Sequence, residues 1–326
     1  MRLGKIGTLL VASIAFGALS SSASALTLKV SDSHNNNHST VVALNEFSSA
    51  IEERTGGDVE VQVFGAGVLG TESEMINQLR MGILDMVRTA PTDLEKFNPV
   101  YSAFLLPYLF KDDAGVEKAM SEVKDDVFHS HPDSGFMGLA WNTAGARSFY
   151  TVDKEINSPA DLEGLKIRVP NSRSMTQAVE MLGATATPVP WGEVYTALQQ
   201  GIVDGAEGSP TSLIDGKFVE VIRHFSFDRH FTIPDVLIIS TKTWDKLNDE
   251  QKAIFKEEAE NYTKRVAVLE EEKVAKAIAL SKEQGVAFKD VDLAPFKARV
   301  MPLYDELRAN NEEAAEIVSR IEAAQE

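Results

Sequence analysis

From about residue 26 onward, apolar and polar residues follow two different periodicities along the chain. Short runs that alternate or are rich in β-branched residues predict strands, and stretches with apolar residues three and four apart predict helices. Glycines close the helical stretches at Gly56, Gly57 and Gly82, as expected at helix ends. The order of elements is typical of a parallel sheet with right-handed crossovers. The predicted elements are a strand at 27–31, a helix at 39–54, a strand at 59–64, a helix between residues 70 and 82, and a strand at 83–87.

The same alternation of predicted strands and helices resumes from about Trp141 onward, without obvious sequence repetition. An apolar, β-branched run at 236–240 then favours a strand that crosses back to the first unit. Asn248 and Gln251 form a capping pair for a long helix that runs towards Gly285. A coiled-coil surface is the alternative for this helix, but its apolar spacing drifts from strict heptads. The elements predicted in the second unit are a short helix at 157–162, strands at 165–169 and 203–206, helices at 172–182 and 191–200, and an extended piece at 186–187.

The chain has 326 residues, which suits two domains that each hold a core. We predict an α/β fold of two lobes, with the long helix lying across both and one more amphipathic helix after Glu312. The expected boundaries are 26–146 plus about 233–274 for the first lobe, and 147–232 plus about 275–326 for the second.

The N-terminus has the pattern of a cleaved export signal. Arg2 and Lys5 precede an apolar run at 6–19, and small residues at 23–25 suit a signal peptidase. The run is shorter than the roughly 20 residues that a membrane-spanning helix needs. We therefore expect residues 1–25 to be removed and the mature chain to reach the periplasm; a membrane anchor or a buried helix is the alternative.

Composition narrows the classes of partner. The formal net charge is −17, so the chain repels nucleic acid and anionic membrane surfaces, and we expect no stable membrane insertion of the mature chain. An acidic protein binds an anion only by gathering its arginines locally. The absence of cysteine excludes disulfides, thiol chemistry and iron–sulfur clusters, so stability depends on buried apolar area.

Charged side chains follow several predicted strands, where open α/β sheets bind their ligands. Arg88 directly follows one strand, Arg168 lies near the end of another, and Arg147 follows Gly145-Ala146. Glu207 and Ser209 come after the strand that ends at 206. Arginine forks bind carboxylates in bidentate fashion, and a buried carboxylate accepts hydroxyl protons. These residues predict a site for a hydroxylated carboxylate, although Glu207 alternatively neutralises one of the arginines.

The segment 34–38 follows the first strand and also lies at this sheet edge. His34 and Asn36 are candidates to donate to ligand hydroxyls. For Asn37 and His38 we favour a role in capping the next helix.

Three further candidates come from other elements. Glu72 opens a helix and either reaches the ligand or favours the helix dipole. Asn171 is a candidate beside Arg168. Trp191 either stacks on a sugar face or anchors a helix start in the core.

Enzyme chemistry finds little support in the sequence. His129 and His131 lack a carboxylate at metal-ligand spacing, and residues 205–209 lack the lysine that follows a phosphate-binding loop. No G-x-S-x-G elbow occurs. A Ser–His–Asp arrangement is spatial, so it stays open. We predict no catalytic residues, no metal and no cofactor.

The sequence resembles the substrate-binding proteins of tripartite ATP-independent periplasmic (TRAP) transporters of the DctP type. The similarity covers nearly the whole mature chain in the family's order. Its motifs are the stretches 63–70 with Glu72, 84–88, LPYLF at 106–110, GARSFY at 145–150, DLEGLKIRV at 161–169 and GEVYTALQQGIVDGAE at 192–207.

The resemblance implies a two-lobed periplasmic binding protein with a ligand cleft between the lobes and a long lobe-spanning helix. It also implies delivery of the ligand to small and large membrane subunits. The residue matching Arg168 makes the main salt bridge to the ligand carboxylate in this family, and the residue matching Arg147 assists it. The pattern of Arg88, Glu72 and GARSFY is most similar to members that take sugar acids such as hexuronates.

One departure concerns the ligand. Many relatives carry two asparagines after the glutamate that matches Glu207, whereas Gly208 and Ser209 stand here. Loss of the amides removes ligand hydrogen bonds, and Gly208 leaves room for a larger or differently branched acid. We expect a hexuronate or aldonate; a C4-dicarboxylate or 2-keto acid, a periplasmic enzyme, and a sensor that presents its ligand to a receptor kinase are the alternatives.

Overall fold

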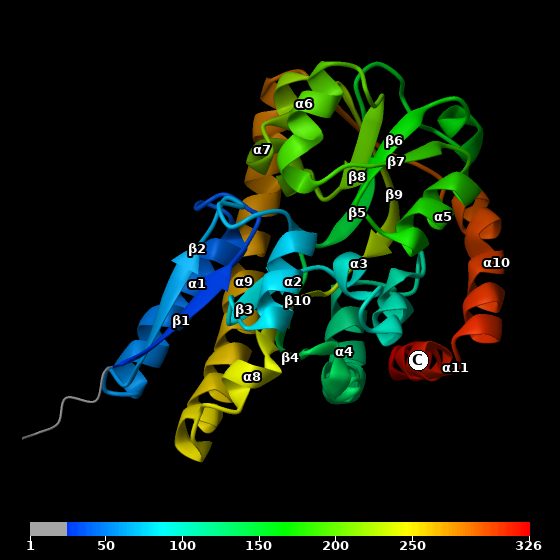
Figure 1. Ribbon diagram of the computed structural model, residues 1–326. Helices are drawn as coiled ribbons and strands as arrows, with labels where there is room; N and C mark the ends of the chain where they lie inside the picture. Colours follow the sequence, from blue (N-terminus) through cyan, green and yellow to red (C-terminus); the bar gives the residue numbers. More distant parts are fainter. Residues whose placement is uncertain (1–24) are drawn as a thin grey trace, which may run out of the picture.

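The computed structural model describes residues 25–326, so the predicted signal segment lies, apart from Ala25, outside the described residues. Two sheets, each flanked by helices, form two lobes (Figure 1). Lobe I is built on the sheet β2-β1-β3-β10-β4 and lobe II on the sheet β11-β9-β5-β8-β6-β7. The predicted two-lobed α/β fold is confirmed.

The strands alternate with helices along most of the chain. The strands are β1 (Leu26–Ser31), β2 (Val59–Phe64), β3 (Met86–Thr89), β4 (Phe136–Asn142), β5 (Ala146–Thr151), β6 (Lys166–Val169), β7 (Thr185–Pro188), β8 (Gly205–Gly208), β9 (His224–Thr232), β10 (Asp235–Ser240) and β11 (Ala287–Asp290). The helices are α1 (Ser39–Arg54), α2 (Glu72–Met81), α3 (Pro91–Leu94), α4 (Asp113–His129), α5 (Arg173–Leu182), α6 (Val194–Gln199), α7 (Pro210–Asp215), α8 (Thr241–Trp244), α9 (Asp249–Glu283), α10 (Ala294–Asn310) and α11 (Glu312–Ala324). Short 3₁₀ helices include η1 (Pro99–Leu105), η3 (Pro159–Leu162) and η4 (Trp191–Glu193).

Lobe I contains the predicted parallel strands and one antiparallel strand, β10, which also pairs with β4. β1 pairs in parallel with β2 and β3, as predicted from the alternation of strands and helices. β10 returns from lobe II and runs antiparallel to both β3 and β4. The predicted crossing strand at 236–240 is therefore confirmed, and its reversed direction puts its first residues at the edge where β3 ends.

Two strands begin later than their apolar runs predict. The run at 83–87 is not a strand throughout, because Ile83 lies 57% exposed in the turn after α2 and β3 starts at Met86. The run at 203–206 is likewise displaced, since β8 starts at Gly205. Leu84 and Val203 are nevertheless buried, so they anchor the turn before each strand. Because these apolar residues are buried before the strands begin, the apolar pattern predicted both strand starts too early.

Side-chain caps fix where the principal helices begin. Asn248 and Gln251 form the predicted capping box at the start of α9. His38 caps α1 by accepting from the Thr40 amide, as predicted, whereas Asn37 is exposed and is not the cap. Ser172 caps α5. Such caps satisfy amide donors that would otherwise lack partners at a helix start.

Helix α9 spans both lobes, as the sequence predicts. It packs on α1 and β4 of lobe I and on α7 of lobe II, and Figure 1 shows it running along the back of the molecule from one lobe to the other. Tyr262 and Val266 bury their side chains in the lobe I core. This helix therefore joins two lobes that the chain also connects between β4 and β5 and between β9 and β10.

Several elements were not foreseen from the sequence, among them α4, β4, β9 and α10. At the C-terminal end, α10 packs on α5, whereas α11 packs on α4 and η1. A large apolar core runs continuously through both lobes on this side. The lobe boundaries given above stay a prediction.

Candidate functional site

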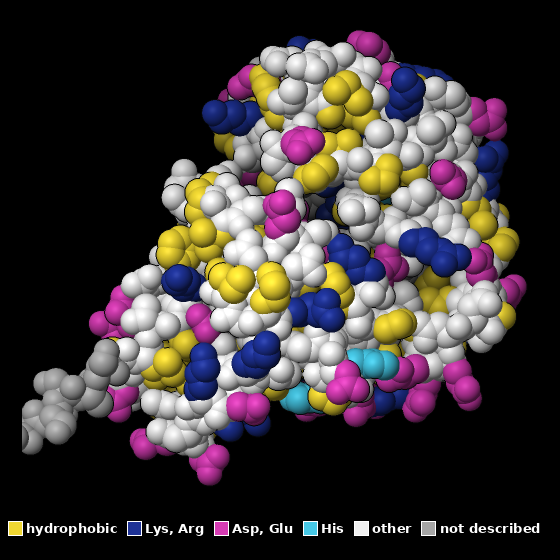
Figure 2. Space-filling view, viewed as in Figure 1, with side chains coloured by type: hydrophobic (Ala, Val, Ile, Leu, Met, Phe, Trp, Pro, Cys, Tyr) yellow, Lys and Arg dark blue, Asp and Glu magenta, His cyan; other side chains and the backbone are white. Residues whose placement is uncertain are grey.

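A cavity of about 200 Å³ lies between the lobes, where the ends of strands from both sheets meet. Figure 2 shows the surface hollowed at the junction of the lobes. Drug-sized ligands occupy pockets of roughly 300–1,000 Å³, so this cavity is suited to a small metabolite. The predicted site residues that line it are His34, Glu72, Arg88, Arg147, Arg168, Asn171 and Ser209. Asn36 is exposed and does not line the cavity, and Glu207 lies behind the wall.

Among the arginines that line this cavity, Arg168 is the one without a counter-ion in the described part of the chain. It lies in β6, is only 4% exposed, and donates from Nε to the carbonyl oxygen of Val189 at 2.8 Å. Within residues 25–326 no carboxylate lies within salt-bridge distance of its guanidinium. Burial lowers the pKa of Arg168, although the nearby Glu207 carboxylate opposes this shift. A buried cation without a partner is costly, so an anion that enters the cavity gains strongly from pairing with it.

Arg147 is already neutralised. It lies near the start of β5, which runs antiparallel to β8, and this pairing brings Glu207 to the same edge. Arg147 donates from Nε to Oε2 at 2.6 Å and from Nη2 to Oε1 at 2.8 Å. Burial would raise the pKa of Glu207, but Arg147 outweighs it and the pKa is lowered. The structure thus favours the second of the two roles considered for Glu207, that of neutralising an arginine.

His230 extends this pair into the interior of lobe II. Its Nε2 lies 3.8 Å from Oε2 of Glu207, and its Nδ1 lies 2.7 Å from Oδ2 of Asp228. Because both carboxylates and the ring are fully buried, they hold Arg147 in a fixed orientation at the cavity wall.

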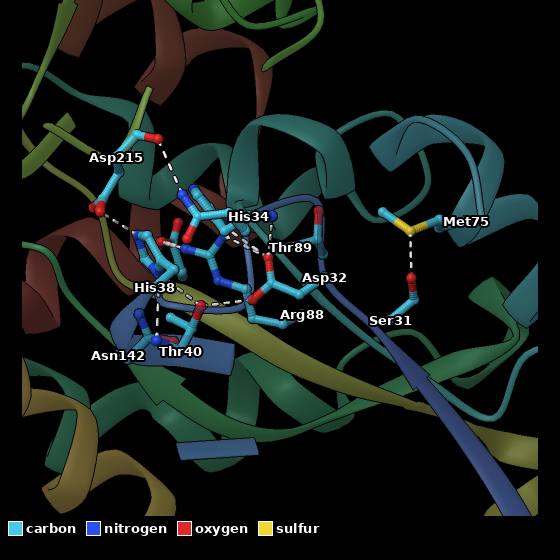
Figure 3. Close-up of polar contacts among 12 residues, drawn as sticks. Ser31, Asp32, His34, His38, Thr40, Met75, Arg88, Thr89, Asn142 and Asp215 are labelled. Carbon is cyan, nitrogen blue, oxygen red and sulfur yellow. Dashed lines mark hydrogen bonds and ion pairs between the residues drawn. The ribbon is translucent and has the colours of Figure 1, made fainter. Parts of the chain in front are cut away.

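Arg88 is the centre of a second charge network, in lobe I (Figure 3). It is 6% exposed, forms an ion pair with Asp235, and places Nη1 2.9 Å from Nδ1 of His34 and 3.9 Å from Oδ1 of Asp32. Thr40 donates to the other oxygen of Asp32 at 2.6 Å. Burial alone would lower the pKa of Arg88, yet Asp235 and Asp32 hold it raised. Arg88 therefore also has its counter-ions within the protein.

The segment 34–38 of lobe I makes direct contacts with lobe II beside the cavity. The ring of His34 stacks on His38 at 3.9 Å and meets Trp191 at 5.1 Å between centroids. Asn35 donates to the Asp215 carbonyl at 3.0 Å, and Nε2 of His38 lies 3.6 Å from the Asp215 carboxylate (Figure 3). Trp191 is half-buried and lines the cavity.

A second contact between the lobes forms at the start of α5. The Glu95 carboxylate of lobe I accepts from the hydroxyls of Ser172 and Ser174, each at 2.5 Å. Carboxylates are stabilised at helix N-termini by the unpaired amides and the helix dipole. The lobes are thus held together by polar contacts around the cavity.

Sequence reasoning missed three carboxyl groups that line the cavity, those of Asp93, Asp215 and Asp235. Asp235 starts β10. Its position beside the cavity could not be predicted from the sequence, because the antiparallel direction of β10 is set by the tertiary structure. Asp93 lies in α3 and is 7% exposed. Burial, followed by the negative charge of Glu72, raises the pKa of Asp93 to about 7. Neither Asp93 nor Glu72 has a cation within salt-bridge distance in the described part of the chain.

A model of the bacterial extracellular solute-binding protein family 7, DctP, matches residues 30–311. The chain belongs to this family. The predicted resemblance to TRAP solute-binding proteins is confirmed, and the members of this family are periplasmic solute-binding receptors. In residues 25–326, no helix combines the length and the apolar character needed to cross a bilayer.

Known proteins match the chain over most of its length. YiiZ of Salmonella typhimurium strain LT2 is 36% identical over 269 residues, which are 82% of each chain. A TRAP periplasmic solute-binding protein from Anaerococcus prevotii with bound α/β-D-glucuronate has a TM-score of 0.89 and 34% identity, and the match covers 92% of this chain and 98% of that one. Another from Xanthobacter autotrophicus Py2, with bound β-D-galacturonate, has a TM-score of 0.88 and 31% identity, over 91% and 100% of the two chains.

Proposed function

We propose that this TRAP solute-binding protein captures a monocarboxylate sugar acid of the hexuronate type. It is exported with cleavage of the signal segment, binds the acid in the periplasm, and delivers it unchanged to the small and large membrane subunits. The observation that carries this proposal is the buried guanidinium of Arg168, which lines the cavity without a counter-ion among residues 25–326.

The pairing of charges supports a ligand with one carboxylate. Arg147 is held by Glu207 and Arg88 by Asp235, so Arg168 is left to bind an anion. A second ligand carboxylate, as in a C4-dicarboxylate, would enter a cavity whose other arginines are already compensated. It would therefore lose hydration without gaining a cation.

The remaining lining groups suit hydroxyls. Glu72 and the hydroxyl groups of Ser209, Thr211 and Ser212 line the same cavity as Arg168. Carboxyl and hydroxyl oxygens accept hydrogen bonds from sugar hydroxyls. This arrangement supports a polyhydroxylated acid over a 2-keto acid, in agreement with the uronates bound by the structural neighbours.

The test is isothermal titration of the purified mature protein with D-glucuronate, D-galacturonate, D-gluconate, pyruvate and succinate. D-glucose is the matched control, because it has the ring and hydroxyls of D-glucuronate without the carboxylate. We expect a hexuronate or the aldonate to bind at least 100-fold more tightly than D-glucose, since roughly 3 kcal/mol of charge-assisted hydrogen bonding is lost with the carboxylate. Tightest binding of succinate or pyruvate, or equal binding of D-glucose, would overturn the proposal.

Delivery without chemistry is tested on the same complex. Mass analysis of the ligand recovered after long incubation should return the acid that was added. A changed mass would replace the transport role by an enzymatic one.

A further inference from the structure

Asp93 lies in the wall of the ligand cavity, and its buried carboxyl group has unusually weak hydrogen bonds for a buried acid. It is 7% exposed, and its side-chain contacts are long ones of 3.4 Å from the hydroxyls of Thr89 and Thr92 to Oδ2. Asp93 also lines the ligand cavity. Buried carboxylates normally have strong hydrogen bonds or a cation, so Asp93 lacks the usual support for a negative charge.

The charged groups around Asp93 come from three elements. Glu72 of α2 contributes a second negative charge, and Lys96, in the turn after α3, together with Arg168 of β6 contributes positive charge. Neither cation lies within salt-bridge distance of Asp93 in the part of the chain that the structure describes. The carboxyl groups of Asp93 and Glu72, on the lobe I side of the cavity, therefore both lie near the charge of Arg168, on the lobe II side.

We propose that Asp93 acts as a protonated hydrogen-bond donor to the ligand, so that capture of the sugar acid takes up one proton from solvent onto its carboxyl group. This inference rests on the proposed function, because the ligand must bring a carboxylate to Arg168. The protonated Asp93 then donates to a hydroxyl or ring oxygen of the ligand.

The physical cause is the change in local charge when the ligand binds. Burial and Glu72 raise the pKa of Asp93 to about 7, while the positive charges of Lys96 and then Arg168 oppose this shift. A ligand carboxylate paired with Arg168 cancels the part of that opposition due to Arg168 and excludes water. Both changes favour the neutral acid over the carboxylate. By linkage, ligand affinity is then constant at acidic pH and falls as the pH rises above 7.

The experiment is calorimetric titration of the mature protein with D-glucuronate, or with D-galacturonate if it binds more tightly. Each pH is measured in two buffers of different ionisation enthalpy, such as PIPES and imidazole at pH 7, which gives the number of protons taken up. D-glucuronate itself stays ionised throughout this range. We expect uptake of close to zero near pH 5.5, about half a proton at pH 7, and an approach to about one proton near pH 8.5.

Two variants identify the carrier of the proton. Asp93→Asn replaces the neutral acid by an amide of the same shape, and we expect no uptake from this group, an affinity independent of pH, and a dissociation constant within about tenfold of the wild type at pH 6. Glu72→Gln removes the neighbouring charge, and we expect the uptake to persist but its midpoint to move to lower pH.

The outcomes separate the two proposals. D-glucuronate or D-galacturonate binding without proton uptake, or an unchanged uptake in Asp93→Asn, overturns the role of Asp93 and leaves the proposed function standing. Loss of uptake in Glu72→Gln alone would move the proton to Glu72 and likewise overturn it. If none of D-glucuronate, D-galacturonate and D-gluconate binds the wild type, both proposals fail.

Discussion

Replacing Arg168 by glutamine should separate ligand binding from folding. Within residues 25–326 this side chain has a single protein hydrogen bond, to the Val189 carbonyl, and no carboxylate partner at salt-bridge distance. Its removal therefore costs at most about 1 kcal/mol of folding free energy. The substitution also removes a buried charge that has no partner, and this gain in stability offsets part of that cost.

The same change should remove most of the binding energy. A guanidinium that holds a carboxylate in bidentate fashion makes two charge-assisted hydrogen bonds, each worth roughly 1.5–3 kcal/mol. Loss of about 3 kcal/mol or more corresponds to a dissociation constant raised more than about 100-fold. Calorimetric titration with D-glucuronate measures this, and thermal unfolding without ligand measures the stability of the variant.

Arg173→Gln is the matched control. Arg173 begins α5, is exposed, and does not line the cavity, so this variant removes the same charge near the site without touching it. We expect its affinity to stay within about threefold of the wild type, as for an exposed charge. A dissociation constant for Arg168→Gln within tenfold of the wild type would refute the assignment of the carboxylate to this arginine.

Three further changes test the architecture around the cavity. Glu207→Gln leaves the guanidinium of Arg147 without its counter-ion, and should lower the free energy of unfolding in a urea titration by about 3 kcal/mol; an unchanged midpoint would contradict the importance of this pair. Glu95→Ala removes a contact between the lobes, so stopped-flow measurements should show D-glucuronate dissociating several times faster, and an unaltered rate would count against that contact. Gly205→Ala puts a methyl carbon 2.4 Å from the Tyr150 carbonyl oxygen, and should cost about 2 kcal/mol of stability in thermal unfolding; an unchanged melting temperature would show that the strands move apart freely.

Much of the fold was predictable from local patterns. Capping residues such as Asn248 and apolar periodicity located α1, α2, α5 and α9, because these signals act within a few residues of the helices they define. The two displaced strands show the limit of such signals. Leu84 and Val203 are buried in turns, and burial by itself does not distinguish a turn from a strand.

The sequence by itself determined the type of chemistry: an acidic chain without cysteine, with arginines placed at the ends of strands. Only the tertiary structure decided which arginine is free. Antiparallel pairing of β5 with β8 brings Glu207 to Arg147, and the return of β10 brings Asp235 to Arg88. Counter-ions supplied from distant parts of the chain cannot be read from local sequence, because electrostatic pairing depends on distance in space and on burial.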